Sequence, residues 1–196
     1  RKVQGKRSDT QGLFWAFDVP HPKPLTQYTL ELHDHRNRPL CDPWPIRTLP
    51  HPDDAPSRFR LMIYTCAGGH DCQRIHGTNQ PYWVSLENRR KLLQTGLALQ
   101  PDAVIANGDH VYWDLRSNGS PGESAEGIQL AGRFSRSALV FGSTNETVLK
   151  RAATPQIVPV YGTDFRSTPM FFLQDDHDYF ENDEASDDLI TFPPSP

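Results

Sequence analysis

The hydrophobic residues in the second half of the chain form three short runs, each bounded by polar or turn-forming residues. These runs lie at residues 59–65, 102–106 and 170–173. Short apolar runs that are rich in β-branched and aromatic residues are typical of buried strands. The pattern therefore predicts three strands, which carry most of the core of an α/β domain.

Two helices are predicted between these strands. The first covers residues 82–100, where leucines recur at helical spacing at positions 86, 93 and 97. The second begins at Thr144, with Ser143 or Thr144 as its N-cap, and is predicted to end near Ala153. The order strand, helix, strand favours a parallel pair of strands joined by a right-handed crossover.

The first quarter of the chain has a different pattern. Aromatic and β-branched runs at residues 13–17 and 28–32 are separated by prolines, and a turn is predicted at residues 36–39. This predicts the end of an antiparallel, β-sandwich-like module, and a linker rich in proline follows at residues 49–56. We expect a β-rich segment with its linker at residues 1–55 and an α/β domain at residues 56–196.

Composition and charge exclude some classes of function. With a length of 196 residues and a net charge of −4, the chain can bury a core and has no overall attraction to nucleic acid, so no stable nucleic-acid partner is expected. No apolar run reaches the roughly 20 residues of a membrane span. The three cysteines are an odd number and indicate no disulfide framework. Because the chain lacks an initiator Met and begins with Arg1, we expect a fragment or a processed product, and the absence of a signal segment therefore carries little weight.

Side chains that bind metals follow each predicted strand. Cys66 ends the first run, with His70 and Asp71 close behind, and Asp109 follows the second run. After the third run the chain becomes strongly acidic, beginning with residues 175–178. The carboxyl ends of parallel strands meet at one edge of a sheet, so the three blocks are expected to converge. Closely spaced carboxylates repel one another unless cations neutralise them, so the acidic block favours bound metal. Bound metal at the edge of the sheet in turn favours a metal-dependent hydrolase.

Taken together, the three blocks resemble the PhoD-like branch of the calcineurin-like metallophosphoesterases. In that branch the first strand ends in Thr-Cys or Ser-Cys, the second in Gly-Asp-x-x-Tyr, and the third in Asp-Asp-His-Asp or Asp-Asp-His-Glu with an Asn nearby. The corresponding residues here are Thr65-Cys66, residues 108–112 and residues 175–178, followed by Asn182. The resemblance covers residues 59–182.

The resemblance implies a fold and an activity. It implies a layered α-β-β-α sheet, present here in part, preceded by a small β-rich domain. It also implies a phosphoric ester hydrolase that acts on small-molecule monoesters or diesters and is exported from the cell. Related chains complete the site with a later histidine-containing block, whereas no histidine follows His177 here. We therefore expect the chain to hold the first half of the metal cage.

The resemblance also implies roles for individual residues. Cys66 would be a thiolate ligand and Tyr112 a phenolate ligand of a ferric ion, while Asp109 would bridge this ion to a second metal. The second metal is expected to be calcium; zinc and manganese are the alternatives. Asp109 and His177 are the expected catalytic residues, with His177 contacting the phosphate.

The calcium ligands implied by the resemblance come from the third block. Asp176 stands where the superfamily has a ligand asparagine, and Asp175 and Asn182 are further candidate ligands. The alternative function is a non-catalytic binding module in which this acidic block holds calcium structurally. A nuclease-like activity supported by the basic residues near Arg1 is a third interpretation.

Each of the main candidates also has a purely structural interpretation. A free cysteine such as Cys66 is often a small buried strand residue. Asp109 would serve equally as a turn residue that bonds its own backbone. Tyr112 would pack beside Trp113 as an ordinary aromatic pair. Finally, Cys72 lies between His70 and His76, a spacing that hints at zinc but lacks a second pair of ligands.

Overall fold

A computed structural model describes residues 1–70, 75, 78–112, 135, 137–175 and 177–179. Its centre is a three-stranded parallel sheet with the order β5-β6-β7. The strands are β5 (Leu61–Tyr64), β6 (Ala103–Asn107) and β7 (Met170–Leu173). In the register, Tyr64 pairs with Ala106, which pairs with Phe172. The three predicted strands are thus confirmed, and their carboxyl ends lie at one edge.

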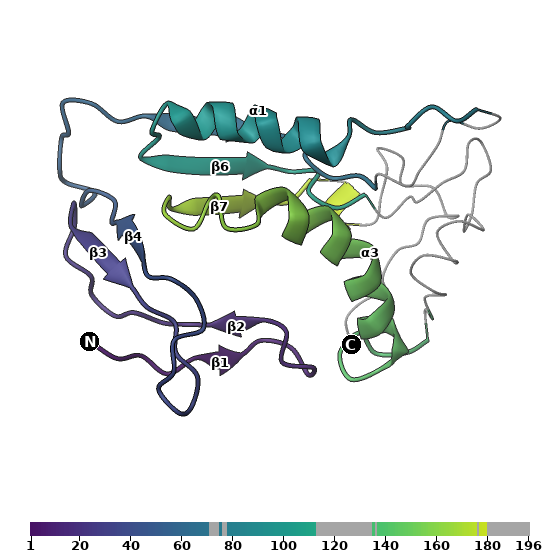
Figure 1. Ribbon diagram of the computed structural model, residues 1–196, viewed down its shortest axis with the longest axis horizontal. Helices are drawn as coiled ribbons and strands as arrows, with labels where there is room; N and C mark the ends of the chain where they lie inside the picture. Colours follow the sequence, from purple (N-terminus) through teal and green to yellow (C-terminus); the bar gives the residue numbers. More distant parts are fainter. Residues whose placement is uncertain (71–74, 76–77, 113–134, 136, 176, 180–196) are drawn as a thin grey trace.

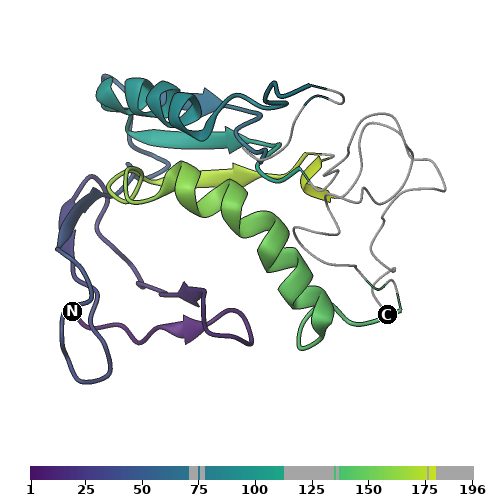
Figure 2. The same ribbon diagram turned by 45° about the vertical axis from the view of Figure 1, so that its right-hand side comes forward.

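Two long helices lie against this sheet, α1 (Leu86–Ala98) and α3 (Thr144–Tyr161), as Figures 1 and 2 show. Leu93 of α1 and Val160 of α3 are buried in one cluster with Val104 of β6. The predicted leucine stripe is confirmed, because Leu86 and Leu97 pack against the same cluster. The architecture is mixed α/β, in agreement with the predicted class.

The opposite side of the sheet exposes apolar side chains. Strand residues alternate between faces, so the neighbours of the core-facing positions point away from the helices. These neighbours are exposed in the structure: Leu61, Ile63, Phe171 and Leu173. A sheet that packs helices on one face and leaves the other face apolar is half of a layered arrangement.

Helix α3 is longer than predicted. The predicted end near Ala153 was wrong, because the helix continues through Pro155 and Pro159 to Tyr161. Each proline removes one backbone donor, but every fourth residue from Ala152 onward is buried, namely Ala152, Gln156 and Val160. Burial of this stripe outweighs the lost hydrogen bonds. At the other end, Ser143 is the N-cap, since its side chain accepts a bond from the Asn145 amide.

The N-terminal segment forms two small antiparallel sheets. The first pairs β1 (Lys6–Arg7) with β2 (Trp15–Ala16), and the second pairs β3 (Gln27–Leu30) with β4 (Trp44–Arg47). Both lie on the side of the molecule where the chain begins, below the parallel sheet in Figure 1. The predicted β-rich character is confirmed, and the assignment to a β-sandwich-like module stays a prediction.

An ion-pair cluster attaches the β1–β2 hairpin to the start of α3. Lys150 bonds both Asp9 and Glu146, whose side chains are each 4% exposed. Glu146 also accepts bonds from the backbone amide and hydroxyl of Thr10. The tip of the hairpin accordingly lies beside the first turn of α3 in Figures 1 and 2. We call Asp9, Thr10, Glu146 and Lys150 the hairpin clasp.

Among the described helices, none combines the length and the apolar character that crossing a membrane requires.

The two faces of the sheet should respond differently to the same polar side chain. Val104→Thr buries a hydroxyl at a fully buried position and should lower the unfolding free energy by about 1–3 kcal/mol. Ile63→Thr introduces the same residue in the neighbouring strand at a position 62% exposed, and should change it by less than about 0.5 kcal/mol. Urea unfolding of both variants measures the difference; equal losses would contradict the assignment of the two faces.

The hairpin clasp should lose its stabilising effect in acid. Hydrogen bonds from Lys150, Thr10 and Gly142 lower the pKa of Glu146 to about 2. Burial acts to raise the pKa of Asp9, but bonds from Lys150 and from backbone amides outweigh it and hold that pKa below its usual value. Both carboxyl groups thus have a lower pKa in the folded state than in the unfolded state, about 4. Their contribution is present above that pH and is lost as the pH falls toward 2.

The measurement is the unfolding free energy between pH 5 and pH 2. Wild-type protein should lose stability steeply across this window. Lys150→Met removes the hydrogen bond that lowers the Glu146 pKa most. This variant should be less stable at pH 5, and its unfolding free energy should decline less steeply as the pH falls. A decline of the same steepness in both proteins would show that the clasp does not contribute to the acid dependence.

Candidate functional site

The loops that follow β5 and β6 meet directly beyond the sheet. The Cys66 amide donates to the Gly108 carbonyl at 3.3 Å, and the Gly68 amide donates to the Asp109 carbonyl at 3.0 Å. Cys66 and Asp109 both adopt a positive φ, 58° and 57°, which is uncommon for residues other than glycine. The backbone therefore turns sharply at both strand ends, and this turn brings the two side chains together.

The carboxylate of Asp109 is the centre of the candidate site. Its Oδ2 accepts a bond from the Cys66 thiol at 3.2 Å and a second from the Tyr112 hydroxyl at 3.0 Å. The residue is only 9% exposed. Its other oxygen, Oδ1, is buried and has no hydrogen-bond partner within the described part of the chain. Buried carboxylate oxygens are normally satisfied, so this oxygen is suited to an electropositive ligand.

The ring of Tyr112 is held between two other rings. Its centroid lies 4.3 Å from that of Trp83 and 4.4 Å from that of His177. Burial raises the pKa of the Tyr112 phenol well above its usual value, and its bonds with Cys66 and Asp109 act in the same direction. The phenol is consequently a proton donor toward Asp109.

The third block reaches the same place through β7. His177 begins a short 3₁₀ helix, η1 (His177–Tyr179), and its ring packs against that of Tyr112 at an interplanar angle of 47°. Asp175 lies against Gly108, where a Cβ atom would come within 2.4 Å of the Asp175 Cβ. The structure thus brings together Cys66, Asp109, Tyr112 and His177, with Asp175 adjacent. The other two predicted ligands, Asp176 and Asn182, lie outside the described residues.

Two histidines near the site have other roles. His70 is 4% exposed, and its Nε2 donates to the Ala152 carbonyl at 3.0 Å. His110 is 6% exposed, and its Nε2 donates to the Leu173 carbonyl at 2.8 Å. Because a carbonyl can only accept, the tautomer of each ring is determined by these bonds. Both rings connect loops to neighbouring elements. The other two residues of the zinc interpretation, Cys72 and His76, lie outside the described residues.

Three buried or half-buried polar side chains hold the loops, and sequence reasoning missed their roles. Arg89 of α1 donates to the carbonyls of Ala67 and Gly68, both at 2.9 Å. Asp178 accepts from the amides of His110 and Val111 at 2.8 and 2.9 Å. The third is Gln156 of α3, whose side chain accepts from the amides of Gly69 and Tyr112. One signal was present in the sequence: Gln156 is a polar residue within an otherwise apolar helical stripe.

The described residues do not make a complete metal cage. Within them, no group of three or more His, Cys, Asp or Glu side chains is placed to hold a metal ion. Cys66 and Asp109 supply two such groups, and the phenol of Tyr112 adds a third donor of another type. The donor set is a partial one at the edge of the sheet.

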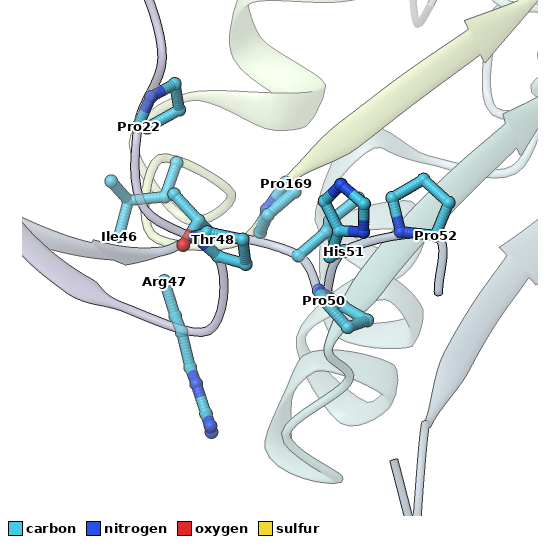
Figure 3. Close-up of a pocket in the computed structure, with 10 residues that line it drawn as sticks. Pro22, Ile46, Arg47, Thr48, Pro50, His51, Pro52 and Pro169 are labelled. Atoms are coloured by element: carbon cyan, nitrogen blue, oxygen red, sulfur yellow. The ribbon is translucent and has the colours of Figure 1, made fainter. Parts of the chain in front are cut away.

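A separate surface cavity lies at the opposite end of the sheet. It has a volume of about 390 Å³, and half of its lining residues are prolines, among them Pro22, Pro50 and Pro169. Figure 3 shows His51 beside Pro50 and Pro52, with Pro169 nearby and the side chain of Arg47 directed away. Pro169 precedes β7, whereas the candidate site follows that strand. The cavity therefore lies between the N-terminal segment and the sheet, and it is distinct from the candidate site.

Comparisons with known proteins find no relative: no protein-family model matches the chain, and no match is found among curated proteins or solved structures. The resemblance to PhoD-like enzymes therefore stays a prediction based on the residue motifs.

Gly108 should be essential to the approach of the second and third blocks. Gly108→Ala places a methyl group against Asp175 at a φ of +81°, while Gly142→Ala has a similar φ of +77° and open space around it. Both substitutions cost about 1–2 kcal/mol for the backbone conformation. Only Gly108→Ala should lower the unfolding free energy by about 1–3 kcal/mol more, because its methyl group overpacks against Asp175. Urea unfolding compares the two, and equal losses would refute a close contact between Gly108 and Asp175.

Proposed function

We propose that the chain provides part of the active site of a metal-dependent phosphoric ester hydrolase of the PhoD-like kind. The observation that carries the proposal is the environment of Asp109. One oxygen of this buried carboxylate accepts hydrogen bonds from a thiol and a phenol. Its other oxygen has no partner among the described residues. All three donors follow parallel strands at one edge, where α/β proteins commonly build their sites.

The donor set fits a metal ion. Removal of the thiol and phenol protons would turn Cys66 and Tyr112 into anionic ligands beside Oδ2 of Asp109. Oδ1 of Asp109 would then be available to a second ion. A thiolate does not suit calcium, which binds oxygen ligands. The resemblance to PhoD-like enzymes is what assigns Cys66, Asp109 and Tyr112 to a ferric ion, and zinc is the alternative that a thiolate also accepts.

The second ion is assigned to the acidic block. Asp175 is exposed and lies beside Gly108, next to the Asp109 edge of the site. Together with Asp176 and Asn182 it forms an oxygen-rich set, which suits calcium or manganese. This assignment rests on the sequence for two of its three ligands.

The residues have separable tasks in phosphoester cleavage. Bound metals supply neutralisation of the phosphoryl charge and lower the pKa of water. Asp109 holds the two sites at a common edge. The half-buried His177 lies against the ring of Tyr112, where its imidazole would hold a phosphoryl oxygen or give a proton to the leaving oxygen of a small-molecule ester.

The open face of the sheet supports a finer proposal for the fold. Four exposed apolar residues form that face: Leu61, Ile63, Phe171 and Leu173. A second sheet packed there would complete an α-β-β-α arrangement, since sheets pack about 10 Å apart through interleaved apolar side chains. The architecture implied by the resemblance would then consist of this layer and its partner.

The test is Asp109→Asn, which preserves size and removes the negative charge. Wild-type protein incubated with ferric and calcium ions should retain metal after gel filtration, measured by elemental analysis. Its hydrolysis of bis(p-nitrophenyl) phosphate should be slow, because the chain is expected to hold only the first half of the metal cage. Asp109→Asn should lower metal affinity by more than about 100-fold, because even supporting residues around metal ligands change it by about 10–100-fold.

The outcomes separate the candidate functions. Retention of calcium alone, unaffected by Cys66→Ser and without hydrolysis, would favour the non-catalytic calcium-stabilised module. Retention of iron in Asp109→Asn at the wild-type level would refute the assignment of Asp109.

A further inference from the structure

Gln156 occupies an unusual place in α3. Its side chain is completely buried. It lies on the same stripe of the helix as Ala152 and Val160, both apolar and buried. A buried amide in such a stripe is costly unless its hydrogen bonds are satisfied.

All the hydrogen-bonding capacity of this amide is used. Oε1 accepts from the Gly69 amide at 2.7 Å and from the Tyr112 amide at 2.9 Å. Nε2 donates to the Tyr112 carbonyl at 2.9 Å and to the Ala152 carbonyl at 3.1 Å. A side-chain amide has two donor hydrogens and two acceptor lone pairs. Its orientation is determined, since a flipped amide would set donors against donors.

These bonds join the two loops of the candidate site. Gly69 belongs to the loop that carries Cys66, and Tyr112 belongs to the loop that carries Asp109. The loops also bond each other near their beginnings, through Cys66 and Gly68. Gln156 connects them farther from the sheet, where the backbone of Tyr112 gives both its donor and its acceptor to this one side chain.

The direction of the Tyr112 hydroxyl depends on this arrangement. The tyrosine ring is held by Trp83 and His177, and the backbone is held by Gln156. With both held, the hydroxyl reaches the same Asp109 oxygen that accepts the Cys66 thiol. A shift of either loop would separate the Cys66 thiol and the Tyr112 hydroxyl from the Asp109 carboxylate that accepts them.

We infer that Gln156 is a positioning residue that brings Cys66 and Tyr112 onto Asp109 from within the core of the protein. Its effect on metal binding rests on the proposed function. Its effect on the loops rests on the hydrogen bonds alone.

The test compares Gln156→Met with Val160→Ala in the full 196-residue chain. Methionine keeps a similar size and leaves the amides of Gly69 and Tyr112 and the Tyr112 carbonyl without their partner. Val160→Ala creates a small cavity four residues later in the same helix, in the core cluster, and controls for general destabilisation. Thermal unfolding establishes how closely the two variants match.

Two readouts are used. The first is hydrogen exchange of the Gly69 and Tyr112 amides by NMR without metal, with the core amide of Val104, which bonds Pro169, as reference. Gln156→Met should speed exchange at the two loop amides at least about tenfold relative to Val160→Ala, with little difference at Val104. The second is titration with ferric ion, followed by the visible absorbance of a ferric phenolate. Gln156→Met should bind about tenfold or more weakly than Val160→Ala.

Each outcome decides a different point. Equal exchange at the loop amides in both variants would overturn the positioning inference. Faster exchange with ferric affinity equal to that of Val160→Ala would also overturn it, because Gln156 would then hold the loops without controlling the ligands. Wild-type protein without a ferric phenolate absorbance would refute the proposed iron site, and amide exchange would still decide whether Gln156 holds the loops.

Discussion

The parallel register of β5, β6 and β7 is the constraint on which the rest of the structure depends. Tyr64, Ala106 and Phe172 are partners in the register of the sheet, so the three strands end at the same level. Cys66, Asp109 and Asp175 follow within three residues of these positions. Their proximity is therefore a consequence of backbone pairing, and a shift of one strand would move its block away from the others.

Desolvation explains why the site is held by so many buried polar groups. Arg89 and Gln156 satisfy loop backbone groups that would otherwise be buried without partners, and half-buried Asp178 does the same for His110 and Val111. Against this background Oδ1 of Asp109, which is buried and has no hydrogen-bond partner among the described residues, is an exception. Unsatisfied groups of this kind are concentrated where a ligand or ion completes the arrangement, which is the physical basis of the proposed metal site.

Helix α3 links the two parts of the chain. Its first turn carries Glu146 and Lys150, which bind the N-terminal hairpin, and its middle carries Gln156, which binds the site loops. One rigid element thus contacts both regions. The prolines within it are tolerated because the buried stripe gains more from packing than the helix loses in hydrogen bonds.

The sequence by itself determined the three strands, the first helix and the positions of Cys66, Asp109 and Tyr112, because strand periodicity and strand-end turns are local properties. Only the tertiary structure decided the extent of α3 and the roles of Arg89 and Gln156. Gln156 bonds residues 87 and 44 positions away, and no local pattern encodes such a distance. The polar residue in an apolar stripe was visible in the sequence, but its partners existed only once the chain had folded.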